Sequence, residues 1–424
     1  MKVNVYYSNL LVGALQDSNK TRQIYFEYSD EFLNSIYELS PEHLPRSKGV
    51  FHNDNESFEY LHGLFYDALP DSWGNRLMEK AFQEKGIPAD SIKPLDKLCY
   101  LGNRSIGALS FEPDTGKNED IPRIKAIDFA KETRSARKIL KGNVSDIGKE
   151  LIEAGGSPGG ARAKVLAGLS EDGKYYYSPS DLPAGYEYWL IKLDEKPDRC
   201  YGILEYAYSR CARMCKIDIP ETRIIKTKDS AGKVLSLFAI KRFDRTKEGK
   251  RVHVHTLAAM THFNFNALQQ PYEELLKRAE MLVKDKTTVE QVFKRIIFNI
   301  AFNNCDDHSK NHSFLMQDNG IWELAPAYDL TFSTGKGKTN THSMTLSGKY
   351  NNFTASDLYA VGKKFGVSTE NIDSILNDTL KARKKLPDML ESYHIPSKRI
   401  EEIVLSLNAI SLLPERKKAQ RHQF

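Results

Sequence analysis

A dense polar cluster follows an apolar stretch late in the chain. Residues 289–304 carry apolar side chains at helical spacing and lead into Asn303-Asn304-Cys305-Asp306-Asp307-His308-Ser309-Lys310-Asn311. Adjacent carboxylates repel each other and lose hydration energy inside a fold, unless a cation or a role in proton transfer compensates for that loss. The cluster is therefore the first candidate for chemistry in this chain.

The spacing inside the cluster predicts phosphoryl transfer. Asp306 precedes Asn311 by five positions, which is the spacing of Asp and Asn in the catalytic loop of kinases. In that loop the Asp receives the proton of the attacking hydroxyl and the Asn binds Mg²⁺. Asp307 is the alternative base, and the five-residue spacing selects Asp306.

A second oxygen donor follows a predicted β-hairpin. Residues 314–316 and 321–324 flank Asp318-Asn319-Gly320, where Asn-Gly favours the positive φ angles of a tight primed turn. In kinases a hairpin likewise separates the catalytic loop from the second metal-binding Asp. Asp329 is therefore the predicted second ligand of Mg²⁺, a hard cation that prefers oxygen donors.

A glycine-rich loop lies between a predicted helix and a predicted strand. Residues 155–160 contain four glycines, which let backbone N–H groups approach phosphate oxygens closely. No Gly-Lys-Ser/Thr closes the loop, so it is not a Walker A motif. An ordinary turn is the alternative interpretation.

A single lysine interrupts the apolar run Tyr188-Trp189-Leu190-Ile191-Lys192-Leu193. A lysine in such a strand requires an anion, and a phosphate group would supply one. Glu205, on the following helix, is the candidate ion-pair partner in the manner of the kinase Lys–Glu couple. The alternatives are an edge-strand lysine for Lys192 and a solvated helix face for Glu205.

The elements that must position these residues differ along the chain. The predictions are a mixed N-terminal sub-domain over 1–122, a nucleotide-binding part over 123–245 and a helical lobe over 246–424. Strands are expected at 3–7, 24–28, 163–169, 174–178, 188–193, 223–226 and 235–243. Helices are expected at 203–215, 272–283, 289–304, 355–365, 369–380 and 400–412. This order predicts an α+β, bilobal kinase-like fold with a β-rich N-terminal lobe, an extra N-terminal sub-domain and a mostly helical C-terminal lobe.

Composition excludes several classes of protein. The 424 residues include 40% hydrophobic and 28% charged residues with a net charge of +5, which argues against a disordered chain and against a strongly electrostatic partner. The five cysteines form no CxxC pairs, so reduced thiols are expected. Residues 1–7 do not begin a signal peptide and no apolar window is long enough to span a membrane, so a cytoplasmic location is expected.

Several separated motifs together resemble the HipA kinases, the toxins of bacterial HipA/HipB toxin–antitoxin systems. They occur in the order expected for that family and cover nearly the whole chain. The motifs are Leu69-Pro70-Asp71-Ser72-Trp73-Gly74-Asn75-Arg76, Ser157-Pro158-Gly159-Gly160-Ala161-Arg162-Ala163-Lys164, Ile191-Lys192, Arg242-Phe243-Asp244-Arg245, Asp306-Asp307-His308-Ser309-Lys310-Asn311 and Tyr328-Asp329-Leu330.

The resemblance implies a role for each matched residue. Asp306 would be the catalytic base, Lys192 a second catalytic residue, and Asn311 and Asp329 the ligands of Mg²⁺. Ser157 would be an autophosphorylation site that switches the kinase off, because a phosphate adds about −1.5 to −2 charges beside a phosphate-binding loop. The implied ATP-binding residues are Ser157, Gly159, Gly160, Ala161, Arg162, Ala163, Lys164, Lys192, Lys241, Arg242, Phe243, His308, Lys310, Asn311, Tyr328 and Asp329.

The resemblance also implies partners. These are a HipB-like DNA-binding antitoxin, DNA mainly through that antitoxin, and a protein substrate on which serine or threonine is phosphorylated. Aminoacyl-tRNA synthetases are among the family's known substrates. Many relatives have a small residue after the catalytic Asp, where this chain has Asp307.

Three other functions use the same residues. A small-molecule kinase of the aminoglycoside type would share the Asp–Asn spacing and the later metal-binding Asp. A metallohydrolase would use Asp306, Asp307, His308 and His312, although no HExxH motif is present. A catalytically silent partner of a DNA-binding antitoxin would have no need for intact Asp306, Asn311, Asp329 and Lys192.

Overall fold

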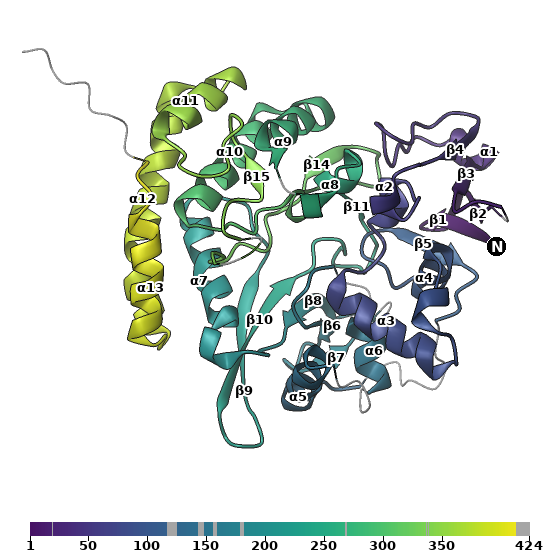
Figure 1. The fold of residues 1–424 in the computed structure, drawn as a ribbon, viewed down its shortest axis with the longest axis horizontal. Helices are drawn as coiled ribbons and strands as arrows, with labels where there is room; N and C mark the ends of the chain where they lie inside the picture. The colour runs from purple at the N-terminus through teal and green to yellow at the C-terminus, as the bar shows by residue number, and fades with distance from the viewer. Residues whose placement is uncertain are drawn as a thin grey trace, which may run out of the picture. The chain divides into compact units, whose positions relative to one another are not determined.

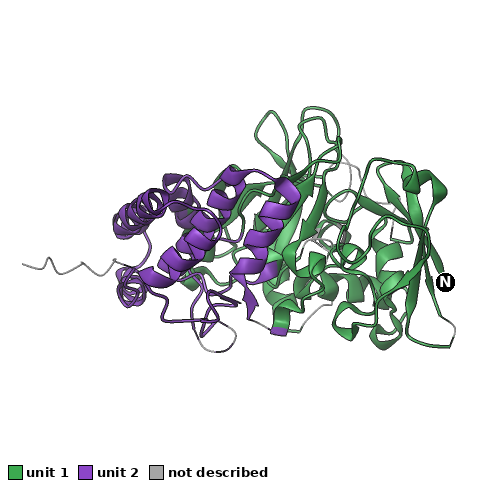
Figure 2. Ribbon diagram, turned by 90° about the horizontal axis from the view of Figure 1, so that it is seen from above, with its two compact units in different colours: residues 1–206, 220–266, 310–328 green, residues 207–219, 267–309, 329–424 purple. Residues whose placement is uncertain are grey.

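The chain forms two compact units, each assembled from separate stretches of sequence (Figure 2). The computed structural model describes residues 1–18, 20–116, 125–142, 148–155, 159–178, 182–267, 269–335, 337 and 339–412. Unit 1 comprises residues 1–206, 220–266 and 310–328, and unit 2 comprises residues 207–219, 267–309 and 329–424. The division at residues 122 and 245 stays a prediction.

A five-stranded antiparallel sheet begins unit 1, with the strand order β4-β3-β2-β1-β5 (Figure 1). In β1 alternate residues are buried, because successive side chains in a strand point to opposite faces of the sheet. The strands are β1 (Lys2–Tyr7), β2 (Leu10–Asp17), β3 (Ile24–Tyr28), β4 (Val50–His52) and β5 (Leu109–Glu112). The predicted strands at 3–7 and 24–28 are therefore confirmed.

Short helices connect the strands of this first sheet. They are α1 (Asp30–Leu33), α2 (Gly63–Tyr66), α3 (Ser72–Glu84) and α4 (Pro94–Leu101). Helix α3 buries Trp73, Leu77 and Met78 along one side, which fixes the helix against the rest of the unit. The HipA-like motif that contains Asp71 thus forms the start of α3.

A second antiparallel sheet of five strands, in the order β7-β6-β8-β10-β9, forms the centre of unit 1. Its strands are β6 (Lys164–Leu169), β7 (Tyr175–Tyr177), β8 (Glu187–Lys192), β9 (Thr222–Lys228) and β10 (Val234–Lys241). The helices next to it in sequence are α5 (Phe129–Leu140), α6 (Lys149–Gly155) and α7 (Tyr201–Met214), and the unit boundary falls within α7. All five predicted strands of this region are present.

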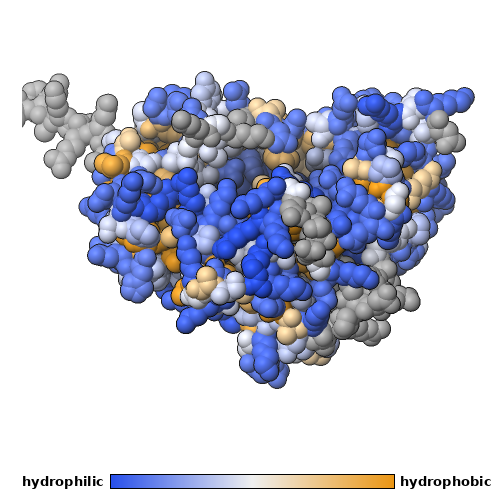
Figure 3. All heavy atoms as spheres, turned by 60° about the horizontal axis from the view of Figure 1, so that its bottom comes forward, coloured by the Kyte–Doolittle hydropathy of each residue, from blue (hydrophilic) through white to orange (hydrophobic). Residues whose placement is uncertain are grey.

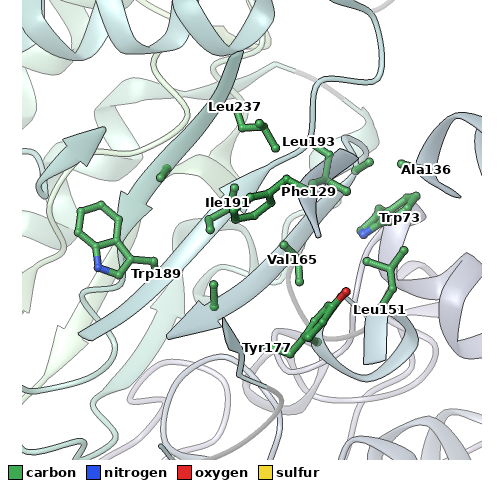
Figure 4. Packing of buried hydrophobic residues seen from close by; sticks show 14 of the residues in the cluster. Trp73, Phe129, Ala136, Leu151, Val165, Tyr177, Trp189, Ile191, Leu193 and Leu237 are labelled. Atoms are coloured by element: carbon green, nitrogen blue, oxygen red, sulfur yellow. The ribbon is translucent and has the colours of Figure 1, made fainter. Parts of the chain in front are cut away.

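Apolar side chains of this sheet form a continuous core (Figure 4). Ile191 from β8 and Val165 from β6 are fully buried and lie in one cluster with Trp73 from α3. Burying an aliphatic side chain of this size stabilises a fold by about 1.5–3 kcal/mol. The core therefore holds α3 and the strands that carry the glycine-rich loop and Lys192 in one rigid arrangement.

A third sheet of unit 1 contains the predicted hairpin. Its strands are β11 (His253–Thr256), β13 (Ser313–Met316) and β14 (Trp322–Leu324), and the short helix α8 (Leu257–Met260) follows β11. The predicted primed turn is wrong. Only Gly320 of the Asn319-Gly320 pair has a positive φ, 77°, and its N–H donates to the Gln317 carbonyl at 2.8 Å. The loop is therefore a three-residue turn in which the glycine alone takes the left-handed conformation.

Unit 2 is mostly helical. Its helices are α9 (Tyr272–Arg278), which continues as a π-helix over Ala279–Val283, then α10 (Lys286–Ala301), α11 (Ala355–Lys364), α12 (Thr369–Ser392) and α13 (Ser397–Asn408). Two short strands that the sequence did not predict, β12 (Gln270–Pro271) and β15 (Met344–Thr345), pair in parallel. Helix α12 continues past the predicted end at residue 380, because Ala382, Leu386 and Leu390 extend its buried stripe.

Hydrophilic side chains cover most of the face drawn in Figure 3, and apolar residues on it occur in small, separate groups. In the part of the chain that the structure describes, no helix combines the length and the apolar character needed to cross a membrane.

Candidate functional site

Helix α10 delivers the chain into the predicted catalytic loop. The helix begins after the N-cap Asp285, whose side chain accepts a hydrogen bond from the N–H of Thr287, and its last turns are almost entirely buried. Asn303 then adopts a positive φ of 52°, a conformation that Asn tolerates better than most residues. The apolar helix thus fixes the point at which the polar loop begins.

The two adjacent carboxylates of this loop lie in opposite environments. The Asp306 side chain is 53% exposed, whereas the Asp307 side chain is fully buried. Asp307 accepts hydrogen bonds from the Tyr272 hydroxyl at 2.5 Å and from the Ser343 N–H at 2.7 Å, and it pairs with His342 Nδ1 at 2.7 Å. All of these residues belong to unit 2. Asp307 therefore anchors the loop, and Asp306 is left accessible.

Electrostatics keep both members of this buried pair charged. Burial alone would raise the pKa of Asp307, but His342 and the two hydrogen bonds outweigh it and hold that pKa below its usual value. Burial lowers the pKa of His342, and the Asp307 carboxylate more than reverses this effect and raises it to about 10. At neutral pH the pair is an imidazolium–carboxylate contact, a strong type of hydrogen bond.

Two asparagine side chains connect the hydrogen bonds around Asp307 to the end of α10. The Asn299 side chain donates to the Tyr272 hydroxyl at 3.0 Å, and the Asn304 side chain donates to the side-chain oxygen Oδ1 of Asn299 at 3.0 Å. The Asn304 side chain also lies 3.5 Å from the backbone oxygen of Asp329. The loop that carries Asp306 and the segment that carries Asp329 are thus linked within unit 2.

Asp329 has an unusual backbone conformation. Its φ is 54°, in the left-handed region, where non-glycine residues are rare and cluster at functional sites. The neighbouring Tyr328 hydroxyl donates to the Lys310 carbonyl at 2.9 Å and lies 2.5 Å from Ser313 Oγ. Tyr328 therefore fixes the end of the predicted catalytic loop, directly before Asn311. The amide oxygen of Asn311 and the carboxylate of Asp329 are hard oxygen donors and fit Mg²⁺ chemically.

Lys192 and Glu205 form the predicted ion pair. Lys192 Nζ lies 2.6 Å from Glu205 Oε1, and both side chains are almost fully buried. Arg162 Nη1 lies 3.2 Å from the other oxygen of the same carboxylate. Because β8 lies between β6 and β10, the edge-strand interpretation of Lys192 is wrong, and the solvated-face interpretation of Glu205 is wrong as well.

A second buried lysine lies opposite Lys192. Lys164, the first residue of β6, is the cross-strand partner of Lys192 in the antiparallel register, and both residues are at most 5% exposed. Two like charges directly opposite in a sheet destabilise it unless anions compensate. Here the anions are Glu205, which pairs with Lys192, and Asp71, whose pKa the nearby Lys164 helps to lower.

The glycine-rich loop connects α6 to β6, as predicted. Gly160 has a positive φ of 92°, and its N–H donates to Asp71 Oδ2 at 2.6 Å. The Lys164 ammonium group donates to the Gly159 carbonyl. Ala161 is exposed and Ala163 is buried. Ser157 lies outside the described residues.

The Arg242-Phe243-Asp244-Arg245 motif is a buried charge cluster. Arg242 pairs with Asp244 at 2.7 Å, and Asp244 also accepts the Gly107 N–H at 2.9 Å. The N–H groups of Lys241 and Arg242 donate to the carbonyls of Glu221 and Tyr188. The cluster therefore joins β10 to the N-terminal part of unit 1.

An aromatic pair lies next to this motif. The Phe243 ring lies 5.5 Å from the Tyr328 ring, measured between centroids. Both side chains belong to unit 1 and are partly exposed. The two ring planes are tilted by 34° to each other.

The remaining loop residues do not form a metallohydrolase site. His308 Nε2 lies 3.9 Å from Asp306 Oδ1, and His312 is buried in a segment that is not α-helical, so the i, i+4 argument does not apply. Within the described ranges, no group of three or more His, Cys, Asp or Glu side chains is placed to hold a metal ion.

Sequence reasoning missed four residues of this arrangement. Tyr272, His342 and Ser343 anchor Asp307 from sequence distances of 35 or 36 residues, and nothing near them indicates this role. Asp71 lies in a motif that the sequence did single out, but its contacts could not be predicted.

Two family models match this chain. A model of the HipA-like C-terminal domain matches residues 156–386, and a model of the HipA N-terminal domain matches residues 3–112. The chain belongs to the HipA family. The match to the C-terminal domain model includes residues 156–160 of the glycine-rich loop and the whole Asp306–Asn311 loop.

Two curated relatives match only part of this HipA-family chain. A Sinorhizobium fredii protein named "Putative kinase Y4dM" is 29% identical over 150 residues, which are 34% of this chain and 36% of that protein. A Haemophilus influenzae protein named "Putative kinase" is 27% identical over 134 residues, 30% of this chain and 39% of that protein. The matches thus span only about a third of the length of these curated relatives.

A solved structure supports the fold. The HipA chain from a complex of HipA, HipB and operator DNA of Shewanella oneidensis superimposes with a TM-score of 0.64 at 15% identity, covering 97% of this chain and 92% of that one. At this identity the likeness concerns the fold alone. The predicted α+β, bilobal kinase-like fold is confirmed.

Proposed function

We propose that this HipA-family chain is an ATP- and Mg²⁺-dependent protein serine/threonine kinase, the toxin of a toxin–antitoxin pair. The observation that carries the proposal is the buried ion pair between Lys192 on a central strand and Glu205 on the following helix, at 2.6 Å. A Lys–Glu pair of this kind orients the phosphates of ATP in protein kinases. The two relatives that carry the name "Putative kinase" support the same class of activity.

In this proposal the glycine-rich loop and two lysines bind the phosphates. Gly159 and Gly160 have no side chains, so a phosphate oxygen can approach their backbone closely. Lys164 and Lys192 supply the positive charge, and Glu205, which also pairs with Arg162, holds Lys192 in position. Phe243 and Tyr328 offer the aromatic surface against which the adenine would lie.

Asp306 is the proposed base. Its exposed carboxylate accepts the proton of a serine or threonine hydroxyl while the hydroxyl oxygen bonds to the γ-phosphorus of ATP. The bond from that phosphorus to the β,γ-bridging oxygen breaks, and ADP leaves. Asp307 keeps the backbone of the loop fixed during this step, because all of its partners lie in the same unit.

Asn311 and Asp329 would hold Mg²⁺, which neutralises charge on the phosphates when it is bound. His308, next to the buried Asp307, lies on the same loop as the base and would contact the nucleotide, as would Lys310. Lys241 and Arg242 would contribute to the adenine side. Ser157 is the proposed site of inhibitory autophosphorylation.

A HipB-like DNA-binding antitoxin is the proposed partner, because the structure with the matching fold is a complex of HipA with HipB and operator DNA. DNA would be reached mainly through that antitoxin. The substrate is proposed to be a cytoplasmic protein of the host cell, such as an aminoacyl-tRNA synthetase.

Incubation of the purified protein with Mg·ATP and a bacterial lysate tests the proposal. Mass spectrometry should find new phosphoserines or phosphothreonines on a host protein, and on Ser157, that are absent after chelation with EDTA and absent with Lys192→Met. Phosphate that appears only on aminoglycosides or other small hydroxyl compounds would refute the protein-kinase assignment. No transfer to any acceptor would refute the kinase assignment altogether.

A further inference from the structure

Asp71 belongs to the motif 69–76, to which the proposed function assigns no role. It stands at the N-cap position of α3, where an Asp side chain usually accepts a hydrogen bond from its own helix. The Asp71 side chain makes no such bond. A conventional cap stabilises its helix, so the chain forgoes this stabilisation at Asp71 and uses the carboxylate elsewhere.

One carboxylate oxygen holds the glycine-rich loop. Asp71 Oδ2 accepts the Gly160 N–H at 2.6 Å, and the N–H of Trp73 donates to the Gly160 carbonyl at 3.4 Å. The indole N–H of Trp73 donates to the Lys164 carbonyl at 2.9 Å. The start of α3 therefore contacts the loop on both sides of the Gly160 residue and again at the first residue of β6.

The glycines of the loop match this contact. A side chain at position 159 would place its Cβ 2.9 Å from Asp71 Oδ2, and one at position 160 would place it 2.5 Å from Lys164 Nζ. Position 160 also has the positive φ that glycine tolerates best. Close packing against Asp71 and Lys164 is thus one physical reason for glycine at both positions.

The other carboxylate oxygen holds the predicted catalytic loop. Asp71 Oδ1 pairs with Lys310 Nζ at 2.5 Å, and the two side chains are 18% and 11% exposed. The same ammonium group lies 5.3 Å from the Phe265 ring and 5.6 Å from the Tyr66 ring, measured to the centroids. These aromatic faces also attract a cation, so Lys310 is held on several sides.

The electrostatics agree with a persistent pair. Burial alone would raise the pKa of Asp71, but Lys310, the Gly160 N–H and the nearby Lys164 lower it. The Asp71 side chain is therefore a carboxylate at neutral pH.

We infer that Asp71 is a positioning residue that couples the phosphate-binding loop to the catalytic loop. It fixes the Gly160 peptide and Lys310 with one carboxylate, and Lys310 directly precedes Asn311, the proposed Mg²⁺ ligand. All of the contacts lie within unit 1. The N-terminal motif thereby sets the shape in which the loop receives the phosphates of the nucleotide. This inference rests on the proposed kinase function.

Binding of a fluorescent ATP analogue with Mg²⁺ to the full-length protein tests the inference without requiring turnover. Asp71→Asn keeps the size of the side chain and removes its charge, and it should weaken nucleotide binding at least 10-fold. Asp128→Asn is the matched control, because Asp128 is also an N-cap Asp but its side chain accepts the N–H of Lys131 in its own helix, α5. That control should bind the nucleotide like the wild type.

A double-mutant cycle with Lys310→Gln separates coupling from general damage. If the two residues act through one contact, the double variant should bind the nucleotide no worse than the single variant that has the lower affinity. If Asp71→Asn does not fold, nucleotide binding by Lys310→Gln alone still tests the contact between Asp71 and Lys310.

Four outcomes count against the inference in distinguishable ways. Unchanged nucleotide binding by Asp71→Asn would overturn it. A double variant whose fold-loss of binding equals the product of the two single-variant losses would overturn it as well. Tighter binding by Asp71→Asn would also overturn it, because Asp71 would then compete with phosphate for the Gly160 N–H. A wild-type protein that binds no Mg·ATP would overturn the proposed function itself.

Discussion

Replacing Asp307 by alanine should destabilise the protein far more than the same replacement at the adjacent Asp306. The Asp307 side chain is fully buried, and its loss leaves the His342 imidazolium without its counter-ion. Removing one partner of a buried ion pair costs about 3–5 kcal/mol. The Tyr272 hydroxyl and the Ser343 N–H would lose their acceptor as well, so the upper part of this range is expected. Asp306→Ala changes an exposed side chain and should stay within about 0.5 kcal/mol of the wild type.

Equilibrium unfolding in urea, followed by far-UV circular dichroism, measures this difference. The three tryptophans, Trp73, Trp189 and Trp322, all lie in unit 1, whereas Asp307 lies in the helical unit 2. Helical dichroism therefore reports the affected unit more directly than tryptophan fluorescence does. Asp307→Asn keeps an acceptor oxygen but loses the charge, and it should fall between the wild type and Asp307→Ala.

Equal losses of stability at the two positions would refute the anchoring role of Asp307. A loss below about 1 kcal/mol for Asp307→Ala would show that the anchor does not hold the loop. Phosphoryl transfer that depends on the Asp307 carboxylate, and not on that of Asp306, would reverse the assignment of the base.

Two further predictions follow from the buried charges. The Asp307 carboxylate overcomes the effect of burial and raises the pKa of His342 from 6.5 to about 10. The stabilisation of the fold by this pair should therefore be complete below pH 6.5 and decline between pH 6.5 and 10. Urea unfolding measured at several pH values should show this decline in the wild type and a flatter pH dependence in His342→Gln. Glu205→Gln leaves the buried Lys192 ammonium group without its neutralising partner, so the KM for ATP in initial-rate assays should rise at least 10-fold. An unchanged KM would contradict this prediction.

Local patterns in the sequence predicted much of the site. A lysine inside an apolar strand indicated a buried anion partner, and Lys192 does pair with Glu205. Helical spacing of apolar residues predicted the helix before Asp306, although the predicted boundaries lie three residues too late at both ends. These signals are readable because each depends on residues that are close together in the chain.

Contacts between distant segments could not be predicted. Asp71 and Lys310 are 239 positions apart, and Asp307 and His342 are 35 apart. Strand β11 was also missed, because the alternating histidines of His253–Thr256 do not show the usual apolar alternation. Histidine is amphipathic and can face a core when its ring nitrogens find partners, as His253 does with the Leu39 carbonyl at 3.0 Å.

Comparison of wild-type protein with Asp306→Asn, in a γ-phosphate transfer assay with labelled ATP, tests the central claim most directly. If Asp306 is the base, transfer should fall at least 1,000-fold, equivalent to about 4 kcal/mol of transition-state stabilisation, while binding of Mg·ATP and the urea midpoint stay unchanged. Transfer by Asp306→Asn at the wild-type rate would contradict it.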